Sequence, residues 1–172
     1  IEFILNGTNT PNETTVGTMH ASLIQKQQSM INDLNAQYED FYVYGGNDLS
    51  TAPFTMSADG RTLTFNHTFP GDSDVTTVVL KMEKDGNGGY GFQVDANASK
   101  GPGGTALTQA EALTAIQKSM TEHGYVDIGY GTIDDKTTLL DTFTGGFNVL
   151  TGINTSQAAG LKSPQDILDA LN

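Results

Sequence analysis

Cysteine is absent from this chain of 172 residues, and basic side chains are scarce. Without cysteine, neither a disulfide nor a thiolate metal site can form. The 20 acidic and 8 basic side chains leave a formal charge of −12, and the isoelectric point is about 4.3. A chain this acidic has too few cations to displace counterions from nucleic acid or to dock on anionic lipid. We therefore expect no nucleic-acid partner and no membrane partner.

Long hydrophobic runs are also missing. No apolar stretch approaches the roughly 20 residues that span a bilayer, and no signal-peptide pattern is visible. Only 37% of residues are apolar and 16% are charged, and glycine, threonine, asparagine and serine are abundant instead. This composition favours many turns and short strands over a helical bundle. The length suits one domain, or one domain and part of another.

The clearest periodic pattern lies in Thr15–Tyr38, which we predict to be a long amphipathic helix. Its apolar residues recur at spacings of three and four, which places them on one stripe of a helix. This packing stripe consists of Val16, Met19, Leu23, Met30, Leu34 and Tyr38. We expect the stripe to be covered by further parts of the natural chain or by neighbouring subunits. The alternative is that it packs into a core within this chain.

The middle of the chain is predicted to be β-rich with one short helix. The predicted strands are Phe41–Tyr44, Pro53–Met56, Thr62–Asn66, Val75–Glu83, Tyr90–Asp95 and Tyr125–Tyr130, and a further one at Gly145–Val149 after a polar connection over Thr132–Thr142. Residues 75–83 and 90–95 are expected to pair as a hairpin with their apolar side chains on one face. Thr108–Glu111 fits a capping box, so a short helix should begin there and stop at Gly124.

The end of the chain carries the start signals of another helix. Ser163 is a suitable N-cap, proline follows it, and Asp166 lies three residues after the cap. The apolar residues Leu168 and Leu171 then begin a stripe, but so short a helix is marginal alone. We predict that the natural protein continues beyond residue 172. The overall prediction is an α+β fold in which a long helix and a returning helix bracket a β-rich inserted domain.

A glycine-rich motif at residues 86–91 matches the dinucleotide fingerprint G-x-G-x-x-G. That fingerprint requires a helix immediately afterwards, whose N-terminus receives the pyrophosphate. Residues 92–95 alternate like a strand instead, so the tip of a hairpin explains the glycines better. We expect no cofactor.

Three histidines and several aspartates could in principle hold a metal ion. His20, His67 and His123 fall in different elements and lack metal-binding spacing. Calcium could find oxygen ligands among the turn residues Asp72, Asp74, Asp85, Asp134 and Asp135. None of these matches the twelve-residue calcium loop, and no nucleophile motif is present. We therefore predict no metal site, no catalytic residue and no enzymatic activity, while zinc or calcium remains an open alternative.

Residues 37–55, which read QYEDFYVYGGNDLSTAPFT, resemble the flagellin family, most nearly its hook-associated proteins of the hook–filament junction. In that family a similar sequence motif ends the long rod-domain helix. A β-rich segment with an Asp-Gly turn follows the motif, as at residues 58–61 here. Shorter resemblances lie at residues 126–131 (VDIGYG), 145–149 (GGFNV), 152–154 (GIN) and 166–171 (DILDAL). The resemblance covers residues 15–66 and 125–172, and residues 67–124 look specific to this lineage.

The resemblance implies two domains. Residues 1–56 and 159–172 would form a discontinuous rod domain, and residues 57–158 a β-rich outer domain. Gly45, Gly46, Pro53 and Phe54 would make the junction between them, where glycine allows unusual dihedral angles and proline directs the exit of the chain.

The resemblance also implies a structural subunit of the bacterial flagellum, located outside the cell after type III export with the help of a chaperone. Its partners would be hook-associated protein 1, flagellin and further copies of itself in a ring, although this stretch alone is expected to be monomeric. One alternative is a flagellin subunit of the filament. Another is an extracellular carbohydrate- or surface-binding module with an aromatic platform drawn from Tyr90, Phe92, Tyr125 and Tyr130.

Overall fold

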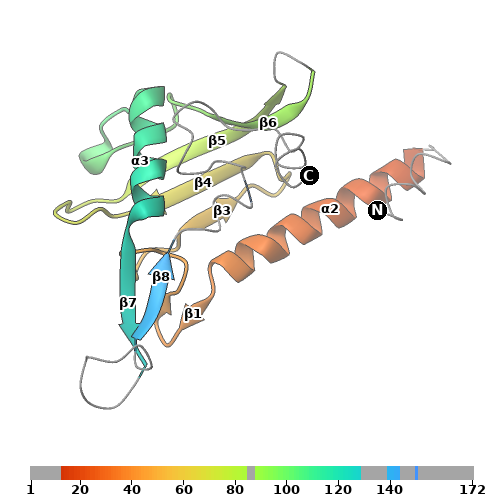
Figure 1. The fold of residues 1–172 in the computed structure, drawn as a ribbon. Coiled ribbons are helices and arrows are strands. Elements are labelled where there is room, and N and C mark those ends of the chain that lie inside the picture. The colour runs from red at the N-terminus through yellow and green to blue at the C-terminus, as the bar shows by residue number, and fades with distance from the viewer. Residues whose placement is uncertain (1–12, 85–87, 129–138, 144–149, 151–172) are drawn as a thin grey trace, which may run out of the picture.

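The computed structural model describes residues 13–84, 88–128, 139–143 and 150 (Figure 1). The elements in chain order are α2 (Glu13–Leu34), β1 (Gln37–Tyr38), β2 (Phe41–Tyr42), β3 (Phe54–Met56), β4 (Thr62–His67), β5 (Thr76–Lys84), β6 (Tyr90–Val94), the 3-10 turn η1 (Pro102–Gly104), α3 (Gln109–Thr121), β7 (His123–Asp127) and β8 (Leu139–Phe143). Helices and antiparallel sheets are thus mixed along the chain, which confirms the predicted α+β class.

The central element is a four-stranded antiparallel sheet in the order β3-β4-β5-β6. Its register aligns apolar residues on one face, as in the pairs Leu63 with Leu80 and Met82 with Phe92. This confirms the hairpin expected between residues 75–83 and 90–95. The glycine-rich motif lies at the connection of that hairpin and is followed by β6, so it lacks the helix that dinucleotide binding needs.

Both described helices cover the same face of this sheet (Figure 1). Helix α2 lies along β3 and contributes Ile31 and Leu34, whereas α3 lies over β5 and β6 and contributes residues such as Ile116. The core that results contains Ile31, Phe54, Met56, Leu63, Phe65, Val78, Leu80, Phe92, Ala112, Ile116 and Met120. The other face carries the polar partners of the same register, such as Thr64.

Helix α3 begins at the predicted capping box. The Glu111 backbone N–H donates to the Thr108 hydroxyl at 3.3 Å, and the Thr108 backbone N–H donates to the Glu111 carboxylate at 2.8 Å. The predicted stop at Gly124 is wrong because the helix ends at Thr121 and His123 is already paired with Phe143 in the β7–β8 hairpin.

The predicted helix Thr15–Tyr38 is too long, since α2 ends at Leu34. The side chain of Asn35 donates to the Phe54 carbonyl at 2.6 Å and accepts from the Phe54 N–H at 3.0 Å, much as a strand would. Beyond Asn35 the backbone bonds elsewhere: the Val43 N–H donates to the Ala36 carbonyl at 3.1 Å, and Tyr38 pairs with Phe41 in the β1–β2 hairpin. The second strand there covers only Phe41–Tyr42, because residues 43–44 turn.

Strand β8 occupies part of the segment that was predicted to be a polar connection. It pairs with β7 in antiparallel register, with Val126 opposite Leu140, so part of this segment is a strand and not a connection. The strand predicted at 145–149 and the helix predicted at 163–172 lie outside the described residues. The predicted boundary between residues 56 and 57 falls in the turn of the β3–β4 hairpin, and the division into rod and outer domains stays a prediction.

Truncating the core under α3 tests this packing. The Ile116 side chain is fully buried between α3 and the sheet, so Ile116→Ala should leave a cavity and lower the free energy of unfolding by about 2–5 kcal/mol. The matched variant Thr114→Ala on the exposed side of the same helix should change it by less than about 0.5 kcal/mol. Urea unfolding followed by circular dichroism measures both, and equal stabilities would contradict the packing.

Candidate domain junction and packing surface

The predicted junction glycines lie in the loop 43–53, which joins β2 to β3. A Cβ on the buried Gly45 would lie 2.1 Å from the carbonyl oxygen of Asp48, so no larger residue fits there. Gly46 has a φ of 65°, which glycine adopts without steric cost. The tight course of the loop therefore depends on both glycines, and their role as a domain junction stays a prediction.

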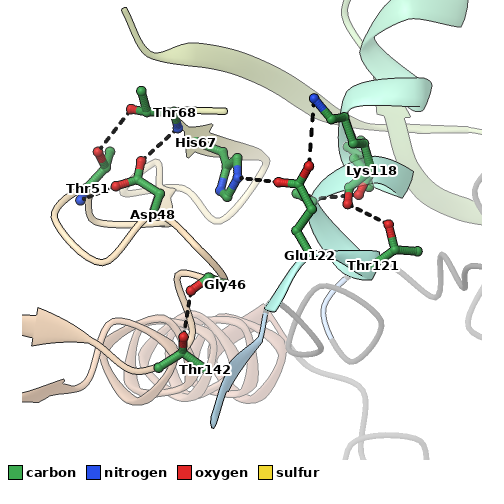
Figure 2. Close-up of polar contacts among 11 residues, drawn as sticks. Gly46, Asp48, Thr51, His67, Thr68, Lys118, Thr121, Glu122 and Thr142 are labelled. Atoms are coloured by element: carbon green, nitrogen blue, oxygen red, sulfur yellow. Dashed lines mark hydrogen bonds and ion pairs between the residues drawn. The ribbon is translucent and has the colours of Figure 1, made fainter. Parts of the chain in front are cut away.

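The β7–β8 hairpin packs directly on this loop. The Thr142 hydroxyl donates a buried hydrogen bond of 2.6 Å to the Gly46 carbonyl (Figure 2). At Gly124 in β7, an added Cβ would lie 2.3 Å from the same carbonyl oxygen and 2.9 Å from the Asn47 Cα. Gly124 is thus required for close approach of two backbones, a role that the sequence did not reveal.

Asp48 holds the loop to the end of β4. One carboxylate oxygen accepts from the backbone N–H groups of Ser50 at 3.2 Å and Thr51 at 3.1 Å, and the other accepts from the Thr68 N–H at 2.7 Å (Figure 2). Burial alone would raise the pKa of Asp48, but the hydrogen bonds to the ionised form outweigh it and hold this pKa below its usual value. The carboxylate is therefore charged at neutral pH and ties the second half of the loop to the end of β4.

Pro53 and Phe54, the other predicted junction residues, are fully buried at the start of β3. The Phe54 ring lies 5.6 Å from the Phe65 ring, and the Pro53 carbonyl accepts from the Asn66 N–H at 2.9 Å. Together with Asn35, which bonds both backbone groups of Phe54, these contacts join the end of α2 to the sheet. The structure thus brings the four predicted residues into one tightly packed segment.

The packing stripe is only partly covered. Val16, Leu23 and Met30 are 54%, 48% and 37% exposed as residues, and Tyr38 is 40% exposed. Met19 and Leu34 are half-buried. Helix α2 instead buries Ile31 against the sheet, so its apolar surface is wider than the sheet covers.

The exposed surface continues past the end of α2. Tyr38 pairs across the β1–β2 hairpin with Phe41, which is 41% exposed. Cross-strand partners point to the same side of a hairpin. The end of the stripe is therefore widened by an aromatic pair, which the periodicity of a helix could not predict.

The remaining candidate residues are dispersed. His20 is exposed on α2, His67 is buried in β4, and His123 is exposed at the start of β7.

The predicted aromatic platform is not formed as expected. Phe92 was expected in the platform but lies in the core instead, and the exposed Tyr90 and Tyr125 belong to different sheets. Tyr130 and three of the candidate calcium ligands, Asp85, Asp134 and Asp135, lie outside the described residues. The other two, Asp72 and Asp74, are exposed in the turn between β4 and β5.

Within residues 13–84, 88–128 and 139–143, no group of three or more histidine, aspartate or glutamate side chains is arranged to hold a metal ion. No helix of this described part is long and apolar enough to span a bilayer. No protein-family model matches the chain, and neither a curated protein nor a solved structure is significantly similar to it. A proposal for its function therefore draws on the junction and the packing stripe.

The close approach at Gly124 gives a direct test. Gly124→Ala should force the β7–β8 hairpin away from loop 43–53 and destabilise the fold by about 1–3 kcal/mol. The control Gly17→Ala lies on α2 with nothing within 4 Å of the new Cβ and should stabilise by about 0.5–1 kcal/mol. Thermal unfolding measures both, and a tolerated alanine at position 124 would contradict the described contact.

Asp48 should make stability depend on acid pH. Because its pKa is lower in the folded chain than the unfolded value of about 3.9, its contribution is present above that value and is lost as pH falls through the folded pKa. Asp48→Asn should lower the free energy of unfolding by about 1–3 kcal/mol at pH 7.

In urea titrations at several pH values, the difference between Asp48→Asn and the parent chain should shrink as pH falls below about 3.9 and through the lower folded pKa, where the folded parent loses its charge. Asp72→Asn, on an exposed turn, is the control and should be neutral throughout. A deficit of Asp48→Asn that is independent of pH would contradict the role of the charge.

Proposed function

We propose that this chain is part of a structural subunit of the bacterial flagellum that joins the hook to the filament, of the kind called hook-associated protein 3. The observation that carries the proposal is the packing stripe, on which Val16, Leu23 and Met30 remain exposed along one helix. Large exposed apolar surfaces on a folded chain mark contacts with other chains. The resemblance of residues 37–55 to the flagellin family names the class of assembly.

The spacing of the stripe suits packing against another helix. Val16, Leu23 and Met30 are seven residues apart, and Met19 adds a position between the first two. Apolar residues at this spacing form the seam between helices that lie nearly parallel. In the proposed assembly, α2 belongs to a rod domain, and its seam is covered by helices of the subunit itself or of its neighbours: hook-associated protein 1, flagellin and further copies in the ring.

The junction would hold the outer domain to this rod. Loop 43–53 is fixed by the Asp48 carboxylate, by Phe54 in the core and by the Thr142 bond to Gly46. Such a segment resists bending better than a flexible linker would. A subunit that transmits torque along its helices needs an outer domain that is firmly attached. This function requires no cofactor and no catalytic site.

Two other functions remain as alternatives to the junction subunit. A flagellin of the filament would use the same stripe and junction, and only its position along the flagellum would differ. A carbohydrate- or surface-binding module requires an exposed aromatic platform, and the burial of Phe92 in the core counts against it.

Immunogold electron microscopy of the source cells, with antibody raised against this chain, tests the proposal. A band of gold where the hook meets the filament is the expected result. Gold along the whole filament would replace the junction subunit by a flagellin. Flagella without gold would overturn the flagellar proposal.

The stripe itself can be tested with two variants of one helix. Leu23→Asp places a charge in the stripe, and Gln25→Asp places the same charge on an exposed side of α2 away from it. Leu23→Asp should leave the isolated fold intact but abolish assembly into flagella, because a buried unpaired charge is costly. Gln25→Asp should assemble normally.

Swimming in soft agar and the amount of subunit in sheared flagella measure this difference. Normal assembly of Leu23→Asp would contradict the stripe as a contact surface. Circular dichroism of both purified variants separates a failure to assemble from a failure to fold.

A further inference from the structure

His67 lies where three parts of the structure meet: the end of β4, the end of α3 and loop 43–53 (Figure 2). Its side chain is buried between two aromatic rings. The Phe65 ring stacks on the imidazole with centroids 5.9 Å apart, and the Phe69 ring meets it edge-on at 4.6 Å. A side chain that can take up a proton in mildly acid water is therefore buried against two aromatic rings.

The polar atoms in this pocket are incompletely satisfied. Neither ring nitrogen of His67 has a hydrogen-bond partner, and its Nε2 lies 3.6 Å from the Glu122 Oε2, which is buried and also without a hydrogen bond. The Lys118 Nζ lies 3.7 Å from the other oxygen of Glu122 and 4.3 Å from the centre of the Phe69 ring. Each unsatisfied buried polar group costs about 1–3 kcal/mol, which lowers the free energy needed to open this contact to water.

The charges around His67 act in both directions. Burial opposes the imidazolium most strongly and lowers the pKa of His67, and Lys118 lowers it further. Asp48 and Glu122 favour the charged form but do not offset burial. The oxygens of Asp48 already accept bonds from residues 50, 51 and 68. A proton on His67 in the closed structure would thus have one free acceptor, Glu122 Oε2.

We propose that His67 is a pH-sensitive latch, which takes up a proton from mildly acid water by opening the contact between the end of β4, loop 43–53 and the start of β7. The start of β7 belongs to this contact because Glu122 connects α3 to β7 and Gly124 packs on loop 43–53. No covalent bond changes; one solvent proton binds an imidazole nitrogen that becomes hydrated in the open form. The inference is independent of the flagellar proposal.

The direction of the effect follows from proton binding. In the closed form the pKa of His67 is below its unperturbed value of about 6.5, so the open form binds more protons in mild acid. Stability of the closed junction is complete above that value and falls as pH drops toward the folded pKa. The equilibrium constant for opening should rise up to about tenfold per pH unit over this window.

Hydrogen exchange of the chain by mass spectrometry at pH 7.5 and pH 5.5 tests the latch. After correction for intrinsic exchange rates, peptides covering residues 43–53 and 122–127 should lose protection at the lower pH, by up to about tenfold, while β5 keeps its protection. His67→Phe keeps a ring between Phe65 and Phe69 and should abolish this loss. His20→Gln removes an exposed histidine and should retain it.

Three results would overturn the latch: unchanged protection of these peptides, equal loss in β5, or the same loss in His67→Phe. If His67→Phe does not fold, Glu122→Gln provides a second test by proton NMR of the imidazole. Because Glu122 favours the imidazolium, its removal should shift the His67 titration midpoint to lower pH. An unmoved midpoint would also overturn the proposal.

Discussion

Burial of the one apolar face of the β3–β6 sheet is the constraint on which the rest of the structure depends. Helices α2 and α3 both lie on this face, and Ile31 and Ile116 are the residues that each buries most completely. Only one side of α2, the side with Ile31, packs on this face. Its neighbouring side, with Val16 and Leu23, therefore remains exposed outside the core.

The same constraint explains why loop 43–53 is so closely packed. The chain passes from the end of α2 through the β1–β2 hairpin and this loop before it enters β3, and the Asn35 and Asp48 side chains bond backbone groups of Phe54 and Thr68. The β7–β8 hairpin can then approach only where Gly124 and Gly46 leave room. A titratable histidine beside this junction couples its packing to pH.

Local patterns predicted the elements whose signals are contained in a few residues: the capping box at Thr108, the alternation of Leu63 and Phe65, and the hairpin around the glycine-rich motif. They failed where long-range contacts decide. Helix α2 ends before Tyr38, which pairs with Phe41 in the β1–β2 hairpin, and β8 forms by pairing with β7. Family resemblance alone singled out Gly45, Gly46, Pro53 and Phe54 as a predicted junction. Gly124 and Thr142 act through partners distant in sequence, and Asp48 combines local bonds to Ser50 and Thr51 with a distant one to Thr68.

The central claim is that the packing stripe contacts other helices of a flagellar assembly. Photo-cross-linking in intact flagella, from a benzoylphenylalanine placed at position 23, tests it most directly. The account predicts covalent adducts with rod segments of the same or neighbouring axial proteins from position 23, and none from position 25 on the exposed side of α2. Adducts from position 25 alone, or from neither position, would contradict it.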